Sequence, residues 1–230
     1  MKLDKIKGTV MGIFLLASRH TCLSQGFINL DFESAKIIPI SPTVIAVTNA
    51  LPGWTVYLGN NSQSQITYDN PALGSAWVSL ITINDPYGAP LSGSYSVYLQ
   101  GGAYPDTPAA TISQTGLIPG WAVSLLFEGR TGTEPGALEV SLDGQALNFS
   151  ALSTEANYTL YGADISAFAG TTETLAFSAL QNVGLYNSWE IDNIQFSPSP
   201  VPEPGELALA ALGGLLLACR RWKFFRYEKR

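Results

Sequence analysis

The acidic side chains that could do chemistry in this chain occur in two short pairs. Asp31 and Glu33 are two residues apart near the start, and Glu190 and Asp192 repeat this spacing near the end. Because side chains alternate between the two faces of a strand, each pair is predicted to present both carboxylates on one face. Two carboxyl groups that flank one sugar bond are what a glycoside hydrolase needs. The other interpretation of the spacing is two pairs of solvated strand carboxylates without a ligand.

The other side chains that usually carry catalysis lie only at the ends of the chain. His20 is the single histidine, and Cys22 and Cys219 are the two cysteines. Residues 25–200 therefore have no Ser-His-Asp triad, no Cys-His dyad, no imidazole or thiolate metal site and no disulfide. Only carboxylates remain for chemistry, and because a surface or ion-binding role explains them more simply than catalysis does, we expect this region not to be an enzyme.

Aromatic side chains are the remaining candidates for ligand contact, since sugar rings can stack on their flat faces. Tyr87 and Tyr104 lie in loop-like sequence and are the predicted ligand-binding residues. Trp54 and Trp121 each follow a Pro-Gly pair. We expect both tryptophans in the core, because large aromatic side chains dominate buried area.

The sequence that must position these residues is divided into many short strands. Strand-like segments are separated by Gly, Pro, Asn and Ser, and no stretch of the body carries a long 3.6-residue apolar period. Asp143-Gly144 predicts a two-residue hairpin turn. The pattern predicts an all-β, antiparallel two-sheet sandwich with a short helix-like piece at 165–169. The predicted strands are 26–32, 43–48, 54–58, 65–69, 76–83, 93–99, 110–115, 121–128, 137–142, 145–149, 157–164, 172–180 and 188–196.

The body of the chain is strongly acidic. Between residues 25 and 200, fourteen acidic side chains stand against two cations, Lys36 and Arg130, which gives a net charge of −12. Such a surface repels nucleic acid and anionic lipid and favours neutral or cationic partners. We therefore expect no nucleic-acid partner. A simpler interpretation of the charge is solubility outside the cell.

The first 24 residues have the organisation of a secretory signal peptide. Lys2, Lys5 and Lys7 precede the apolar run 10–17, and small residues follow near Ser24. We expect residues 1–24 to be removed on export, so that the body lies outside the cytoplasm.

The last thirty residues have three parts in a fixed order. Prolines end the preceding fold, an apolar segment is predicted to form a single transmembrane helix, and cations hold the last segment in the cytoplasm. The parts are the motif Val201, Pro202, Glu203, Pro204 and Gly205, the apolar segment 206–219 and the basic segment 220–230.

This order resembles the PEP-CTERM sorting tail of Gram-negative bacteria, which an exosortase recognises. The resemblance implies that 198–230 is a sorting tail and that Pro202, Glu203 and Pro204 are the recognised residues. It also implies an exosortase and the inner membrane as partners, and a final position at the cell surface or in the extracellular matrix. An ordinary C-terminal membrane anchor after a proline-rich linker is the alternative.

The body contains a series of short sequence motifs whose order resembles that in the galactose-binding-like jelly rolls, a group that includes many carbohydrate-binding modules. The resemblance implies a jelly-roll sandwich over 25–197 and a structural calcium ion held by Glu33 and Asp192 together with backbone carbonyls. The alternative is that no ion is bound. In the first of these sequence motifs, Leu30 stands where glycine is usual. The motifs are Asn29-Leu30-Asp31-Phe32-Glu33, 51–54, 112–115, 161–170 and 189–196.

Together these observations predict an exported cell-surface or exopolysaccharide-associated protein. Its sorting tail is expected to be processed by an exosortase, and its body to be a non-catalytic module that binds glycan or forms matrix. Two alternatives stay open. One is a purely structural surface protein without a ligand, and the other is a polysaccharide-cleaving enzyme that uses carboxylates alone.

Overall fold

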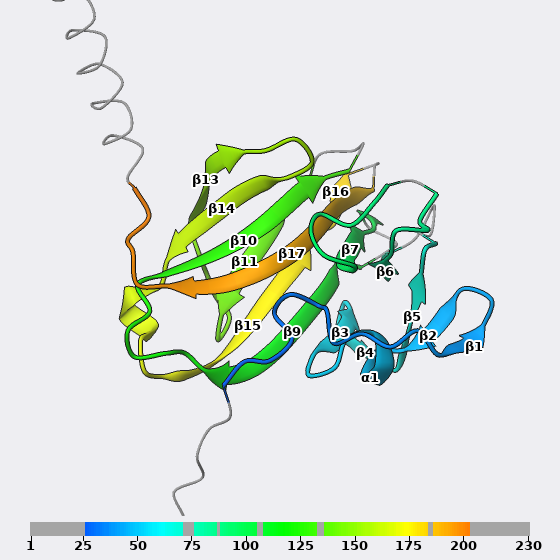
Figure 1. Cartoon of the computed structure of the whole chain (residues 1–230), viewed down its shortest axis with the longest axis horizontal. Coiled ribbons are helices and arrows are strands. Elements are labelled where there is room, and N and C mark those ends of the chain that lie inside the picture. The colour runs from blue at the N-terminus through cyan, green and yellow to red at the C-terminus, as the bar shows by residue number, and fades with distance from the viewer. Residues whose placement is uncertain are drawn as a thin grey trace, which may run out of the picture.

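The structure is a computed structural model that describes residues 26–70, 76–86, 88–104, 108–132, 136–183 and 186–202. It confirms the predicted all-β class, because two sheets stack face to face (Figure 1). Strand pairing is antiparallel except between β5 (Gln65–Tyr68) and β6 (Trp77–Ile81) and between β8 (Ala103–Tyr104) and β16 (Asn182–Val183). Helix is limited to α1 (Val47–Ala50) and the 3-10 turn η1 (Ser166–Phe168) in the described part. The turn η1 falls in the predicted helix-like piece.

The larger sheet has nine strands, and the smaller has six. The order in the larger sheet is β1 (Pro39–Ser41), β2 (Val44–Ala46), β5 (Gln65–Tyr68), β6 (Trp77–Ile81), β7 (Ser96–Gly101), β17 (Asn187–Ser197), β10 (Ser124–Thr131), β14 (Thr159–Asp164) and β13 (Phe149–Thr154). The order in the smaller sheet is β12 (Gln145–Ala146), β11 (Leu138–Leu142), β15 (Thr172–Ala179), β9 (Ala110–Leu117), β3 (Thr55–Leu58) and β4 (Asn61–Gln63). A separate pair joins β16 (Asn182–Val183) to β8 (Ala103–Tyr104).

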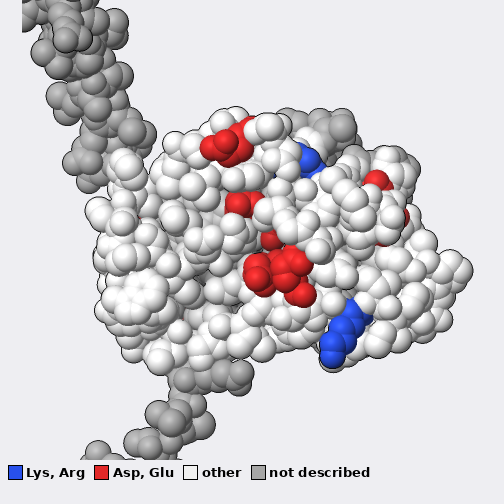
Figure 2. Space-filling model, in the orientation of Figure 1, with Lys and Arg blue, Asp and Glu red and all other residues white. Residues whose placement is uncertain are grey.

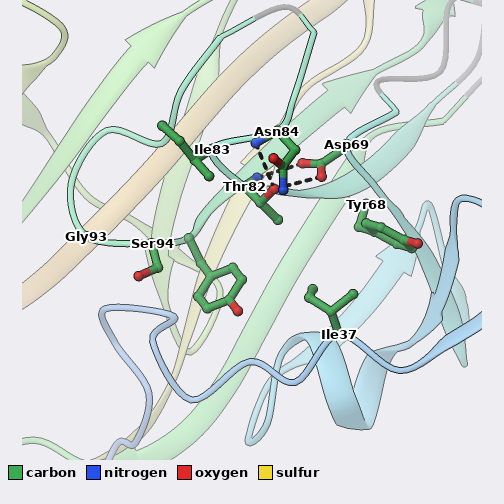
Figure 3. Close-up of a pocket in the computed structure, with 9 residues that line it drawn as sticks. Ile37, Tyr68, Asp69, Thr82, Ile83, Asn84, Gly93 and Ser94 are labelled. Carbon is green, nitrogen blue, oxygen red and sulfur yellow. Dashed lines mark hydrogen bonds between the residues drawn. The ribbon is translucent and has the colours of Figure 1, made fainter.

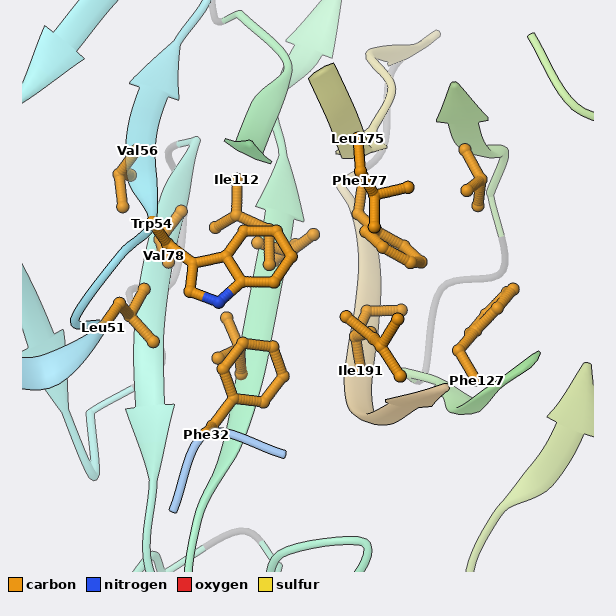
Figure 4. Packing of buried hydrophobic residues seen from close by; sticks show 14 of the residues in the cluster. Phe32, Leu51, Trp54, Val56, Val78, Ile112, Phe127, Leu175, Phe177 and Ile191 are labelled. Carbon is orange, nitrogen blue, oxygen red and sulfur yellow. The ribbon is translucent and has the colours of Figure 1, made fainter. Parts of the chain in front are cut away.

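The core lies between the inner faces of the two sheets (Figure 4). Phe127 from the larger sheet and Phe177 from the smaller sheet meet edge to face, with ring centroids 5.2 Å apart. Both side chains are fully buried, and burying a side chain of this size contributes about 1.5–3 kcal/mol. This burial of alternate residues along each strand is what holds the two sheets together.

The predicted hairpin turn is confirmed. Asp143 and Gly144 join β11 to β12, and both have left-handed backbones, with φ of 47° and 79°. Two consecutive positive φ angles define the tight turn whose twist matches that of the flanking strands. Glycine suits the second position because it has no Cβ to clash in this conformation.

The predicted strand 26–32 is wrong, because this segment is a turn with one isolated bridge between Gly26 and Leu117. The backbone is left-handed at Asn29 and Phe32, with φ of 51° and 57°. Side-chain contacts explain the turn. The Trp54 indole N–H donates to the Asn29 carbonyl at 2.9 Å, and the buried Phe32 ring packs against Trp54.

Other boundaries also differ from the predicted strands. The segment 43–48 leaves the strand after Ala46 and turns into α1, while 145–149 divides between β12 and β13. Trp121 is not a core residue: it is 57% exposed, whereas Trp54 is 4% exposed and confirms its prediction. The difference arises because Trp121 lies in the turn before β10, closed by the Ala122 N–H donating to the Pro119 carbonyl.

The described chain ends just beyond β17. Val201 is half-buried and Pro202 is exposed, while Glu203, Pro204, Gly205, the predicted transmembrane segment and the predicted signal peptide lie outside the described residues. None of the helices in the described ranges has the length and apolar character needed to cross a membrane.

Candidate functional site

A row of acidic side chains lies on the face of the larger sheet opposite the core. In the antiparallel register of β17 and β10, Glu190 lies opposite Arg130 and Asp192 lies opposite Glu128. All four side chains therefore share one face of these two neighbouring strands. Glu190 and Asp192 therefore do share a face, as predicted. Asp31 and Glu33 do not lie on a strand, because the turn at 29–34 replaces it.

The row is buried, which is costly for charged groups unless they are paired. Asp192 is 1% exposed and Glu128 is 5% exposed. Arg130 forms an ion pair of 2.6 Å with Glu190, which also accepts a short hydrogen bond from the Ser96 hydroxyl. One oxygen of Glu128 accepts from the Asn193 side-chain amide at 2.8 Å, and its other oxygen has no partner among the described residues.

Burial also changes the acidity of this row. Removal from water raises the pKa of Asp192 to about 7, and the hydrogen bonds from Ser92 and Asn193 only partly oppose that effect. The pKa of Glu190 is raised too, again chiefly by burial, although Ser96 and Arg130 favour the charged form. Asp192 is therefore the acid in this row whose charge is least stable near neutral pH.

The connection between β6 and β7, residues 82–95, folds over the acidic row. The Asp192 carboxylate accepts from the Ser92 N–H at 3.0 Å and from its hydroxyl at 3.2 Å. Glu33 accepts from the Ser94 and Tyr95 N–H groups at 2.6 and 3.1 Å. The two predicted calcium ligands thus bind opposite ends of one short segment, residues 92–95.

The donor types at this stretch fit calcium only in part. Glu33 and Asp192 supply the carboxylate oxygens that calcium prefers, and an ion held by both would tie the first turn to the last strand. Within the described ranges, however, no three acidic, histidine or cysteine side chains converge to hold a metal. Calcium binding by this pair stays a prediction.

An open cleft of about 440 Å³ lies beside the same connection (Figure 3). It is bounded by the end of β5, by the start of the β6–β7 connection and by that connection's last residues before β7. Its size is within the range of small-ligand sites. The lining residues are Ile37, Tyr68, Asp69, Thr82, Ile83, Asn84, Gly93, Ser94 and Tyr95.

The apolar part of the cleft consists of two tyrosines and two isoleucines. Tyr68, Tyr95 and Ile37 are half-buried and pack against the edge of the core, which holds them in place. Ile83 is 74% exposed at the rim. The Tyr68 hydroxyl donates to the Pro42 carbonyl at 3.0 Å. The Tyr68 side chain is therefore held both by packing against the core and by this hydrogen bond.

The polar part of the cleft is organised around Asp69. Its two carboxylate oxygens accept from the Thr82 N–H and from the Thr82 hydroxyl, each at 2.7 Å, and the hydroxyl in turn accepts from the Asn84 N–H at 3.1 Å (Figure 3). A carboxylate offers about four acceptor positions, so roughly two are free for a ligand. Thr82 is buried, and this anchors Asp69 in one orientation.

The rim at Gly93 is shaped by its neighbour Glu33. Gly93 has φ of 58°, a conformation that favours glycine, and a Cβ there would collide with the Glu33 carboxylate. The glycine therefore lets Glu33 approach the chain and bind the next two N–H groups.

The two tyrosines predicted from sequence are not among the described residues of the cleft. Tyr87 lies outside the described residues, and of Tyr104 only the backbone is described, in β8 beside Val183. Their role in binding stays a prediction. Tyr68 and Tyr95 were missed because each belongs to a strand-like segment. The signal that could have found them is the position of each at one end of a strand, next to turn-forming residues.

Comparison with known proteins yields only distant structural similarity. No protein-family model matches the chain, and no curated protein matches it. A family 11 carbohydrate-binding module from Clostridium thermocellum in complex with a mixed-linked tetrasaccharide is 10% identical, with a TM-score of 0.36 over 70% of this chain and 97% of that one. A xyloglucanase domain of a type three effector from Sinorhizobium fredii is 8% identical, with a TM-score of 0.30 over 70% of this chain and 99% of that one.

A third similar structure is the enzymatically active domain of tailspike protein 4 from bacteriophage CBA120. It is 13% identical, with a TM-score of 0.36 over 64% of this chain, and the chain spans only 19% of its length. Similarities at this level assign neither a ligand nor an activity to this chain. The cleft is therefore the feature of this chain that bears on its function.

Proposed function

We propose that this protein is a non-catalytic glycan-binding module whose ligand lies in the cleft beside the β6–β7 connection. The observation that carries the proposal is the combination of fixed aromatic rings with a fixed carboxylate in one open hollow. Tyr68 and Tyr95 offer apolar faces, and Asp69 offers acceptor positions. Sugars have apolar C–H faces and hydroxyl edges, so both halves of the cleft have a counterpart on such a ligand.

The carboxylates argue for binding rather than cleavage. Hydrolysis of a glycosidic bond needs two carboxyl groups on either side of it. Asp69 is the one carboxylate among the residues described as lining the cleft. Glu128, Glu190 and Asp192 are all buried, and the β6–β7 connection binds Asp192 through Ser92, so these carboxylates offer a polysaccharide no access. A carboxylate-only enzyme is therefore the weaker candidate.

We further propose that the body is a jelly roll that is exported and displayed at the cell surface, with exopolysaccharide as its ligand. Two stacked, mainly antiparallel sheets support the jelly-roll assignment. The signal-peptide pattern and the motif at Val201–Gly205 support export and exosortase sorting. Mass spectrometry of both ends of the mature protein tests this part. An intact N-terminus at Met1 in protein taken from the producing cells would contradict export by signal-peptide cleavage.

Binding is tested with the full chain in detergent micelles against a panel of neutral and charged polysaccharides. We expect saturable retention by at least one, and a loss of about tenfold or more in affinity for Tyr95→Ala, because a tenfold loss corresponds to ~1.4 kcal/mol of ring contact. Tyr57→Ala is the matched control, since Tyr57 is a half-buried strand tyrosine that does not line the cleft. Equal losses in both variants, or no retention by any polysaccharide, would refute the proposal and leave a structural role.

A further inference from the structure

We propose that the cleft selects its glycan by charge: it binds sugars that carry a protonated amine more tightly than neutral sugars, and it rejects sugars that carry carboxylate. This inference rests on the proposed glycan-binding function and names the class of ligand for that site.

The first observation is that the one carboxylate described as lining the cleft still has acceptor positions unused. Asp69 lines it directly, with about two acceptor positions unused. Glu33 is not a lining residue; it is exposed, and its carboxylate contacts Gly93, Ser94 and Tyr95 at the rim, where it adds a second negative charge near the cleft. A ligand amine would meet the Asp69 carboxylate, whereas a ligand carboxylate would meet like charge.

The second observation is that four backbone donors around the cleft are already used. The Thr82 N–H donates to Asp69, and the Asn84 N–H donates to the Thr82 hydroxyl. The Ser94 and Tyr95 N–H groups both donate to Glu33. Anion sites in proteins are commonly built from converging backbone N–H groups. Here three of these groups bind the protein's own carboxylates and the fourth binds a hydroxyl, so none of the four is free for an anionic sugar.

The third observation concerns the cations. Lys36 and Arg130 are the cationic residues within the ranges that the structure describes, and Figure 2 shows basic side chains at two separated places around a central group of acids. Arg130 is bound to Glu190 and also donates to the Ala89 and Asn157 carbonyls. Lys36 is not one of the lining residues. Lys36 is an exposed residue directly before the lining residue Ile37, so the two cations are adjacent to the cleft at most and neither lines it.

The test uses one polysaccharide in three forms: the neutral chain that binds best in the panel above, its carboxymethyl derivative and its aminoethyl derivative, matched in length and degree of substitution. Affinity of the full chain is measured by calorimetry with the amines protonated. We expect the aminoethyl form to bind about fivefold more tightly than the neutral form, the factor expected for one ammonium–carboxylate contact in water. The carboxymethyl form is expected to bind at least fivefold more weakly, and both differences are expected to shrink in high salt.

Three variants separate selection in the cleft from attraction by the whole acidic surface. Asp69→Asn keeps a residue that tolerates the left-handed backbone at this position, where φ is 46°, and it removes one charge inside the cleft. Glu139→Gln removes one charge from an exposed position on β11 in the other sheet. We expect the amine preference to fall several-fold in Asp69→Asn and to be unchanged in Glu139→Gln. Lys36→Gln is expected to leave the rejection of the carboxymethyl form unchanged.

A fourth substitution adds charge at a position that folding does not depend on. Ile83 is an exposed rim residue, so Ile83→Lys is expected to fold, with Ile83→Gln as its control. Ile83→Lys should gain affinity for the carboxymethyl form and lose the amine preference. The inference is overturned if the wild type binds carboxymethyl and neutral forms equally, or if Asp69→Asn and Glu139→Gln change the preference alike. If Tyr95→Ala binds every form as the wild type does, the glycan site itself is misplaced, which is a failure of the proposed function.

Discussion

Burial of Asp192 predicts an unusual dependence of stability on pH. An aspartate in the unfolded chain has a pKa near 3.8, whereas in the folded protein burial raises it to about 7. The folded state therefore holds its proton more strongly than the unfolded state does. The stability that this protonated group contributes is fully present below pH 4 and is lost as the pH rises through about 7.

The size of this effect follows from the shift. A rise of about three pKa units, at ~1.4 kcal/mol per unit, makes the folded protein ~4 kcal/mol less stable at pH 8 than at pH 4 through this residue alone. Other carboxylates also titrate in this range, so the quantity to measure is a difference. We expect the free energy of unfolding of the wild type, relative to Asp192→Asn, to fall by about that amount between pH 4 and pH 8.

The assay is urea unfolding followed by tryptophan fluorescence at several pH values, with a chelator present throughout. Glu139→Gln serves as the control, because Glu139 is an exposed acid in the other sheet. A difference between wild type and Asp192→Asn that stays constant from pH 4 to pH 8 would refute the reasoning. It would show that Asp192 is ionised in the folded protein at no cost.

Three further predictions concern calcium, the hairpin turn and the tryptophans. If Glu33 and Asp192 hold calcium, adding the ion at neutral pH raises the melting temperature and chelation lowers it, because an ion bound only by the folded state stabilises it by mass action. A melting temperature that stays unchanged in a calcium titration would contradict calcium binding. Gly144→Ala is expected to cost about 1 kcal/mol, a few degrees of melting temperature, since alanine is strained at φ of 79°, whereas Gly120→Ala, which meets nothing within 4 Å, is expected to be near neutral. Trp54→Phe is expected to lower the free energy of unfolding by about 1–3 kcal/mol, because the indole hydrogen bond and some packing are lost. Trp121 is exposed, so Trp121→Phe is expected to lower it by less than about 0.5 kcal/mol. Both values are measured by urea unfolding, and similar costs would contradict the burial assigned to the two tryptophans.

The strands were predictable wherever alternation of apolar residues was the dominant signal. The segments that became β3, β5, β9, β11, β14, β15 and β17 were located to within a few residues, because a half-buried strand must alternate apolar and polar side chains. The hairpin at Asp143-Gly144 was predictable for a local reason as well: only a few residue types accept two consecutive positive φ angles. The turn at 29–34 was not, since its shape depends on contacts with Trp54, which lies more than twenty residues away.

The candidate site was predictable only in its components. Glu33, Glu190 and Asp192 were singled out by spacing, but spacing could not show that two of them bind one loop and that the third pairs with Arg130. Asp69 and Tyr95 were not singled out at all, and Tyr68 was one of many aromatic side chains that the strand pattern assigned to the core. They line one cleft because the parallel pairing of β5 with β6 and the course of the β6–β7 connection bring them together.

By itself, then, the sequence determined the class of secondary structure, the acidic character of the body and the absence of histidine and thiol chemistry from residues 25–200. These are properties of composition and of neighbours along the chain. Tertiary structure alone decided which carboxylates are buried, which tryptophan faces water and which side chains share a cleft. The physical reason is that burial and proximity depend on strand order, and strand order is set by packing between segments far apart in the chain.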